Sequence, residues 1–245
     1  MAKYLKLFET HSEYVDFTHT EDFLLPNVSY CKDVTDEVHY NPLPTPQPSN
    51  ILLYEAPAKL TETTSDKGNG LHTNKFNGPT IISHDFDNGV GTVELSGDLI
   101  ALPEYTFYGA STITKVSMPN GVTNIGQYAF YSCNGLTSVG VSGSGASVEL
   151  PDSLTTIYNY AFYNCSGLTT VTIPSTVTTI NDSAFYTCTH LTSITVLATT
   201  PPTIGSNQVF ANTNNCPIYV PSESVDTYKA AYGWSSYASR IQAIP

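Results

Sequence analysis

The stretch Leu168-Thr-Thr-Val-Thr-Ile-Pro-Ser-Thr-Val-Thr-Thr-Ile180, followed by Ala184-Phe-Tyr-Thr-Cys188, decides the fold of this chain. Its apolar residues recur at fixed offsets, and the part from Val171 to Ile173 alternates as a short β-strand does. The pattern returns around five phenylalanines spaced 23, 32, 23 and 25 residues apart, namely Phe107, Phe130, Phe162, Phe185 and Phe210. One such unit cannot bury its apolar edge alone, so the repeat predicts a stack of coils with a continuous core.

The alternation within each strand assigns its faces, because successive side chains point to opposite sides of a sheet. The pairs predicted to point inward are Val93/Leu95, Val116/Met118, Val139/Val141, Val171/Ile173, Ile194/Val196 and Ile218/Val220. We expect the strands that carry them to be neighbours in one parallel sheet. Six strands about 4.8 Å apart would make this sheet about 25 Å wide, enough for a peptide or a short oligosaccharide.

The outward residues of the same strands form a candidate binding face. They are Lys115, Ser117, Ser138, Thr170, Thr172, Ser193, Thr195 and Tyr219. Threonine and serine are also ordinary solvated strand residues whose hydroxyls pair across strands. For any single position we favour that simpler interpretation, and we treat the column as a whole as the candidate site.

An extra segment of nine residues, 142–150, lengthens one repeat period from 23 to 32 residues. Insertions in solenoids emerge as loops on one face, often the binding face, although tolerated drift is the commoner cause. We expect a loop here, with Ser142, Ser144, Ser147 and Glu149 as its candidate binding residues.

Tyrosines flank the repeated phenylalanines and predict an aromatic band. Tyr108, Tyr131, Tyr163 and Tyr186 each follow a phenylalanine, and Tyr105, Tyr128 and Tyr160 stand two residues before one. Stacking of each ring on the next coil would explain the band as structure, and we favour that explanation. An exposed row would equally suit contact with sugar or protein.

The cysteines and histidines do not indicate a metal site. Cys133, Cys165 and Cys188 occupy one register of the repeat, so their spacing reflects the coil, and we expect buried free thiols. The six histidines form no H-x-x-x-H pair, and His190 is expected in a solvent-facing turn. Asn88-Gly89 predicts a hairpin turn. We find no catalytic motif in the sequence, so we expect no enzyme activity, no metal and no cofactor.

Composition excludes several classes of partner. Charged residues make up only 12% of the chain, whereas 33 Thr and 24 Ser supply neutral hydrogen-bonding groups. The net charge of −12 would repel phosphate backbones and anionic lipids, so we expect neither nucleic-acid binding nor membrane insertion. No apolar stretch is long enough for a membrane span, and the first nine residues do not resemble a signal peptide. We therefore expect folding in the cytoplasm.

The unit I-P-x-x-V-T-x-I-x-x-x-A-F-x-x-C-x-x-L-T-x-V resembles the BspA-like leucine-rich repeat of surface proteins from anaerobic gut bacteria and their phages. The resemblance covers about residues 85–221, with a lead-in from Gly70 and a closing segment from Cys216 to Trp234. It implies adhesion and binding to proteins or host surfaces. Residues 1–49 lie outside it. Within them, Leu25-Pro-Asn-Val-Ser-Tyr-Cys31 and Val38-His-Tyr-Asn-Pro42 resemble a leader of phage structural proteins.

These observations together predict a β-rich leucine-rich-repeat solenoid, right-handed and with parallel strands on its concave face. The predicted parts are an α+β attachment module over 1–41, a proline-rich linker over 42–49, a lead-in over 50–84, the solenoid over 85–221 and a helical cap over 222–245. The module should contain a helix capped by Thr10 and strands at 23–30 and 37–40. In the cap, Ser222 should start a helix bearing Val225, Tyr228 and Tyr232, followed by Trp234, Tyr237 and Ile241 over the last coil.

The function expected from the sequence is non-catalytic. We expect a phage virion component, of the tail or of a head appendage, that binds a protein or glycan on a cell surface and contacts other virion proteins through its N-terminal module. A bacterial cell-surface adhesin is the alternative, and either could assemble as a homo-oligomer. The ligand itself is not indicated by any residue.

Overall fold

The computed structural model describes residues 29–32, 38–41, 49–65, 68–76, 78–141 and 148–245. They fall into two compact units, 1–45 and 46–245, each of which is described by itself. In the first unit β1 (Ser29–Lys32) pairs antiparallel with β2 (Val38–Asn41). The helix predicted near Thr10, the start of the strand predicted at 23–30 and the proline run 42–48 lie outside the described residues. Within the described part, no helix has the length and apolar character needed to span a bilayer.

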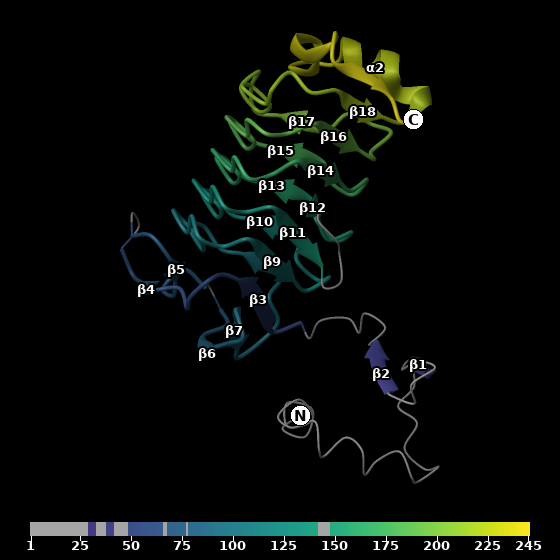
Figure 1. Ribbon diagram of the computed structural model, residues 1–245. Coiled ribbons are helices and arrows are strands. Elements are labelled where there is room, and N and C mark those ends of the chain that lie inside the picture. Colours follow the sequence, from purple (N-terminus) through teal and green to yellow (C-terminus); the bar gives the residue numbers. More distant parts are fainter. Residues whose placement is uncertain (1–28, 33–37, 42–48, 66–67, 77, 142–147) are drawn as a thin grey trace. The chain divides into compact units, whose positions relative to one another are not determined.

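The second unit is a parallel β-solenoid of about six turns (Figure 1), as the repeat predicts. Each repeat supplies one strand to a ten-stranded sheet and one short strand to a five-stranded sheet. The ten-stranded sheet consists, in spatial order, of β6 (Ile81–Asp87), β7 (Val90–Leu95), β3 (Ile51–Glu55), β9 (Lys115–Met118), β11 (Ser138–Val141), β12 (Val148–Glu149), β14 (Thr170–Ile173), β16 (Ser193–Val196), β18 (Ile218–Val220) and β19 (Ile241–Ala243). The five-stranded sheet consists of β8 (Ala101–Leu102), β10 (Asn124–Ile125), β13 (Thr156–Ile157), β15 (Thr179–Ile180) and β17 (Thr203–Ile204). A separate parallel pair is formed by β4 (Glu62–Thr63) and β5 (Leu71–His72).

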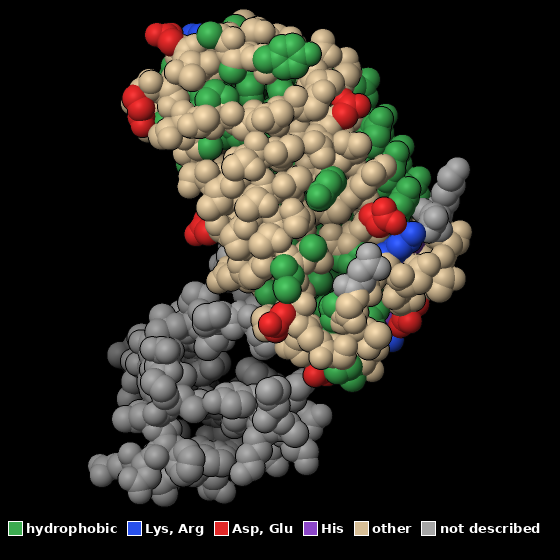
Figure 2. Space-filling model, turned by 180° about the vertical axis from the view of Figure 1, so that it is seen from behind, with side chains coloured by type: hydrophobic (Ala, Val, Ile, Leu, Met, Phe, Trp, Pro, Cys, Tyr) green, Lys and Arg blue, Asp and Glu red, His purple; other side chains and the backbone are tan. Residues whose placement is uncertain are grey.

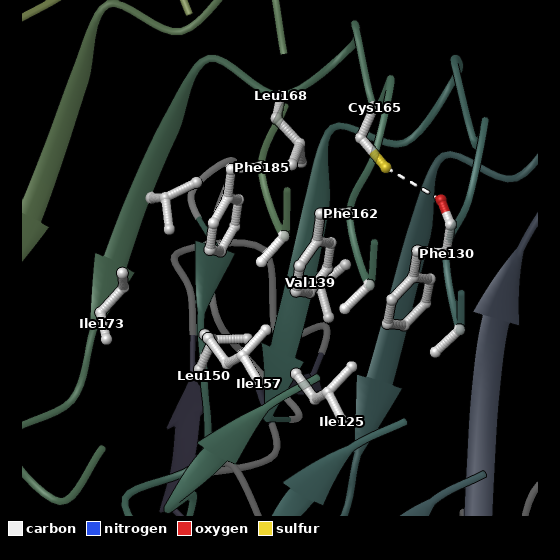
Figure 3. Packing of buried hydrophobic residues seen from close by; sticks show 14 of the residues in the cluster. Ile125, Phe130, Val139, Leu150, Ile157, Phe162, Cys165, Leu168, Ile173 and Phe185 are labelled. Atoms are coloured by element: carbon white, nitrogen blue, oxygen red, sulfur yellow. Dashed lines mark hydrogen bonds between the residues drawn. The ribbon is translucent and has the colours of Figure 1, made fainter. Parts of the chain in front are cut away.

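The core is one continuous column of apolar side chains between the two sheets. The five repeated phenylalanines are fully buried and stack from coil to coil with ring centroids 5.0 to 5.6 Å apart. Figure 3 shows Phe130, Phe162 and Phe185 in one row. The inward-facing pairs predicted from the alternation are also buried, except that the side chain of Val141 lies outside the described set. Stacked rings of this kind explain why the phenylalanine register is kept in every coil.

Threonine hydroxyls tie each coil to the one before it. Thr137 and Thr192 donate hydrogen bonds to the backbone carbonyl oxygens of Thr114 and Thr169, both over 2.9 Å. Thr155 does the same to Thr123 over 3.1 Å at another corner of the coil. Each of these carbonyls also accepts a hydrogen bond from the backbone N–H of the same threonine, so the hydroxyl adds a second bond between consecutive coils.

The start of the ten-stranded sheet differs from the prediction. The strand carrying Val93 is not the neighbour of the strand carrying Val116, because β3 lies between β7 and β9 and pairs antiparallel with both. Tyr54 of β3 faces Gly91 on one side and Val116 on the other. The prediction treated residues 50–84 only as a lead-in, so it missed that their first strand completes the sheet.

A second strand is inserted at the long repeat. β12 lies between β11 and β14, with Gly140 opposite Glu149 and Val148 opposite Val171. The strands of Val139 and Val171 are therefore not direct neighbours, contrary to the prediction. The insert is long enough to place a strand between the two coils, where it pairs with both of their strand edges. Residues 142–147 lie outside the described set.

The hairpin predicted at Asn88-Gly89 is confirmed. Asn88 and Gly89 have φ angles of 48° and 84°, and they connect β6 to β7. Both residue types tolerate this left-handed region, which the tight turn between two antiparallel strands requires.

The C-terminal cap covers the last coil, but its helix is shorter than predicted. A 3₁₀ turn, η2 (Ser222–Ser224), precedes α2 (Val225–Ala230), and a second turn, η3 (Trp234–Tyr237), follows. Tyr228, Trp234, Tyr237 and Ile241 are buried, as predicted. Tyr232 is 92% exposed, contrary to the prediction, because the helix ends at Ala230 and Ala231 is already extended.

Candidate functional site

Five of the predicted face residues form two rows across β14, β16 and β18. Thr170 is in register with Ser193, and Thr172 is in register with Thr195, which in turn faces Tyr219. All five side chains are partly exposed. The alternation of the strands buries their neighbours Val171, Ile173, Ile194 and Val196 in the core. We call these five residues the hydroxyl face: Thr170, Thr172, Ser193, Thr195 and Tyr219.

The other predicted face residues do not extend this surface. Ser117 and Ser138 are only 8% and 3% exposed. Leu53 is the register partner of Ser117, and Lys115 is the register partner of Ser138, so each short serine stands beside a longer side chain. Lys115 itself forms an ion pair with Glu55 over 3.4 Å. The prediction missed this because it did not place β3 in the sheet.

The predicted loop residues are only partly described. Ser142, Ser144 and Ser147 lie outside the described residues. Glu149 belongs to β12, where its backbone pairs with Gly140 and Thr172. The segment is therefore not a loop over its whole length, since its end is a strand of the sheet.

The tyrosines form two stacked ladders, which confirms the structural interpretation of the band. The first ladder is Tyr105, Tyr128 and Tyr160, with both centroid separations 5.0 Å. The second ladder is Tyr108, Tyr131, Tyr163 and Tyr186, with separations of 4.9, 4.8 and 5.2 Å and interplanar angles of 13° or less. We call the two ladders together the tyrosine band.

The two ladders meet at an angle and remain at the surface. Tyr128 and Tyr131 contact edge to face, at 5.6 Å and 67°. All seven side chains are partly exposed, and Figure 2 shows hydrophobic side chains following one another along one edge of the solenoid. Burial, followed by the neighbouring phenols, raises the pKa of Tyr131 above its ordinary value. The central ring is therefore a neutral phenol at physiological pH.

The first ladder has an unusual backbone. Tyr105, Tyr128 and Tyr160 have φ angles of 57° to 59°, in the left-handed region that tyrosine rarely adopts. Each backbone N–H is held by the next coil, as when that of Tyr160 donates to the carbonyl oxygen of Asp182 over 3.0 Å. The stacking of coils therefore maintains a turn that a tyrosine alone would not favour.

The repeated cysteines are buried thiols, as predicted. Cys133, Cys165 and Cys188 are free and fully buried. Burial raises the pKa of all three, that of Cys188 to about 12. Thiols that resist ionisation are poor nucleophiles and poor metal ligands. Among the residues that the structure describes, no group of three or more His, Cys, Asp or Glu side chains could hold a metal ion.

One buried polar network was not predicted. Nε2 of His84 lies 2.8 Å from the hydroxyl oxygen of Tyr54, and Nδ1 of the same ring lies 2.8 Å from Oε1 of Glu62. Both ring nitrogens are therefore hydrogen-bonded. The Tyr54 hydroxyl also accepts from the backbone N–H of Leu60 over 3.0 Å. Tyr54 and Glu62 are 30 and 22 positions away from His84 in sequence, so no motif could have revealed the network. The network fastens β3 to β6 and explains a histidine that the sequence left without a role.

Comparison with known proteins agrees with this geometry. The family model of the BspA type leucine rich repeat region matches residues 100–237 with six copies. Among solved structures, the pneumococcal vaccine antigen PcpA is similar at 21% identity and a TM-score of 0.42, over 59% of this chain and 37% of that one. The chain thus spans little more than a third of that antigen. A search of curated proteins found no match. Because the family model covers more than half of the chain, this protein belongs to the BspA-type leucine-rich-repeat family.

Proposed function

We propose that this protein is a non-catalytic binding protein that holds an extended protein or glycan segment on its hydroxyl face. The observation that carries the proposal is the in-register pair of rows on β14, β16 and β18, where five polar side chains are partly exposed side by side. Strand backbones hold them at fixed spacing, so the surface is preorganised before a partner arrives.

The chemistry of the hydroxyl face favours a neutral, polar partner. Threonine and serine hydroxyls donate and accept hydrogen bonds, and Tyr219 adds an aromatic ring at the end of one row. None of the five side chains is charged. Binding should therefore depend on directional hydrogen bonds and ring contact, and should change little with salt.

We further propose that the protein works in a phage particle, where residues 1–49 attach it to other virion proteins and the solenoid displays the binding face. The division of charge supports this role. Residues 1–99 contain 15 acidic and 6 basic residues, whereas residues 100–221 contain five charged residues in all. The alternative location is the bacterial cell surface, where the same face would bind host protein or glycan. Gene neighbours that encode capsid and tail proteins would favour the virion.

The test is to measure binding of the full chain to a panel of bacterial and mammalian cells, with and without residues 1–45. We expect the shortened protein to bind the same cells, and we expect binding to change by less than about threefold between low and moderate salt. Loss of cell binding on removal of residues 1–45 would reverse the assignment of roles. A steep decline with salt would show that charge, not the hydroxyl face, holds the partner.

A further inference from the structure

The two ends of the ten-stranded sheet are finished differently. At one end α2 and η2 pack against β19. At the other end β6 is the last strand, seven residues long, and within the part of the chain that the structure describes its strand neighbour is β7 alone. The last strand of a sheet presents backbone N–H and C=O groups with which a strand of another molecule can pair.

The hydrogen bonds between β7 and β3 show how the backbone of β7 is oriented. The backbone N–H of Ala56 donates to the carbonyl oxygen of Gly89 over 3.0 Å, and that of Leu95 donates to the carbonyl oxygen of Asn50 over 2.9 Å. Backbone groups alternate in direction from one residue of an antiparallel strand to the next. The odd-numbered residues of β7 therefore bond to β3, and the even-numbered residues bond to β6.

Two residues of β6 present their backbone groups to the open side of this strand. Asp85 stands opposite Thr92, an even-numbered residue, so its own backbone groups bond to β7. The neighbours of Asp85, which are His84 and Phe86, consequently point their N–H and C=O groups away from β7. Beyond them a register shift at residues 81–83 interrupts the regular ladder. The open side thus offers four backbone groups, two from each of these residues.

A lysine already occupies one of the four groups. Nζ of Lys59 donates a hydrogen bond to the carbonyl oxygen of His84. A strand added to β6 would direct one of its own N–H groups to that oxygen, so the ammonium group stands in the place of an incoming donor. Lysine at the edge of a sheet opposes pairing, because the added strand must displace a hydrated charge.

An aspartate opposes pairing with a second copy of this chain in particular. Two copies of β6 use all four groups when they pair antiparallel with His84 of each copy opposite Phe86 of the other. In this register Asp85 lies opposite the same residue of the second copy. The side chain of Asp85 is exposed, and like charges directly opposite each other destabilise a strand pair.

We infer that Lys59 and Asp85 protect the open edge of β6 and keep two copies of this chain from pairing there. Without these two side chains the edge is self-complementary, and two copies join through β6 about a twofold axis. The side chain of Ile82, which is 61% exposed, then lies beside the added strand. The inference concerns the end of the sheet away from the cap, so it does not depend on the hydroxyl face.

The test measures the mass of the full chain by light scattering after size-exclusion chromatography, over about a 100-fold range of protein concentration. In the double variant Lys59→Ala/Asp85→Thr the mass should rise with concentration to about twice that of the wild type. Adding Ile82→Lys places a new charge at the edge and should return the mass to the wild-type value. Asp85→Thr alone changes an exposed strand residue and should produce a smaller rise.

The matched control is Lys229→Ala/Asp226→Thr, which makes the same two replacements at exposed positions of α2 and also leaves the net charge unchanged. It should keep the wild-type mass. An equal rise in this control would overturn the inference, and so would an unchanged mass in both Lys59→Ala/Asp85→Thr and Asp85→Thr. Association that persists after Ile82→Lys would place the contact elsewhere and would also overturn it. Thermal unfolding of each variant checks that the solenoid is intact.

Discussion

The thiol of Cys165 donates a hydrogen bond to the backbone carbonyl oxygen of Phe130, one coil earlier, over 3.0 Å (Figure 3). Cys133 and Cys188 make the same bond to Phe107 and Phe162, over 3.0 and 3.1 Å. The cysteine column is therefore a hydrogen-bonded seam that links consecutive coils next to the phenylalanine stack. A buried thiol serves here because it is small, largely apolar and still able to donate to a carbonyl.

This seam predicts a loss of stability in alkaline solution. The pKa of Cys188 is raised to about 12 in the folded protein, against 9.0 for an unburied thiol. The unfolded chain therefore releases a proton above pH 9 that the folded chain retains, so stability present below pH 9 declines as the pH rises toward 12. Chemical denaturation of wild type and Cys188→Ala between pH 8 and 11 measures the effect. The free energy of unfolding of the wild type should fall by about 1 kcal/mol more per pH unit than that of the variant. Parallel curves for the two proteins would contradict the burial of this thiol.

The phenylalanine stack should dominate the stability of the solenoid. Phe162 lies between Phe130 and Phe185 with both centroid separations 5.0 Å, and it is fully buried. Phe162→Ala should cost about 3–5 kcal/mol, because the cavity cannot close in a stack of fixed repeat. Thr172→Ala, on the hydroxyl face of the next strand, should cost less than about 0.5 kcal/mol. Urea titration compares the two, and equal losses would mean that the inward and outward faces are assigned wrongly.

The inserted strand β3 depends on a glycine opposite its tyrosine. A Cβ at Gly91 would lie 2.0 Å from Cε1 of Tyr54, whereas one at Gly121 would meet nothing within 4 Å. Gly91→Ala should therefore destabilise the protein by about 2 kcal/mol or more, and Gly121→Ala should not. In a Tyr54→Leu background the cost of Gly91→Ala should decrease, because the ring is gone. An unchanged cost in that background would argue against β3 lying beside β7.

The cap should behave as a lid on the last coil. Trp234 is buried and donates through Nε1 to the carbonyl oxygen of Pro202 over 2.8 Å, and its ring packs 4.9 Å from that of Tyr228. Trp234→Ala should cost about 3–5 kcal/mol, since the apolar end of the solenoid would open to water. Tyr232→Ala is the matched control, an exposed aromatic of the same segment, and should cost less than about 0.5 kcal/mol. Comparable losses in thermal unfolding would show that residues 222–245 do not form a lid.

The sequence predicted those parts of the fold that repeat. The repeat positions of Phe162 and Val171 hold an apolar residue in each coil. This recurrence identifies them as inward-facing without any knowledge of the residues that they contact. Strand β12 does not belong to the repeat, and nothing in Val148-Glu149 itself indicates which strand edges it will occupy. The position of β3 was missed for the same reason, because strand pairing is decided by neighbours far away in the sequence.

In the candidate site, too, the features that follow from the repeat were predicted and those set by distant residues were not. Thr172 and Thr195 were placed correctly on an outward row, because strand alternation alone decides that. The burial of Ser117 depends on Leu53, 64 residues earlier, and could not be read from the repeat. Stacking of Tyr131 on Tyr163 was predicted, but the edge-to-face contact between Tyr128 and Tyr131, which joins the two ladders, is a property of the three-dimensional arrangement.

The hydroxyl face is tested most directly by comparing two sets of four lysine substitutions in the full chain. The first set changes Thr170, Thr172, Ser193 and Thr195 on the ten-stranded sheet. The second changes Asn124, Thr156, Thr179 and Thr203, which form one register row on the five-stranded sheet and add the same charge. Binding to the cells that the wild type recognises should fall more than tenfold for the first set and remain within about twofold for the second. Equal binding by the two sets would contradict the assignment of the partner to the hydroxyl face.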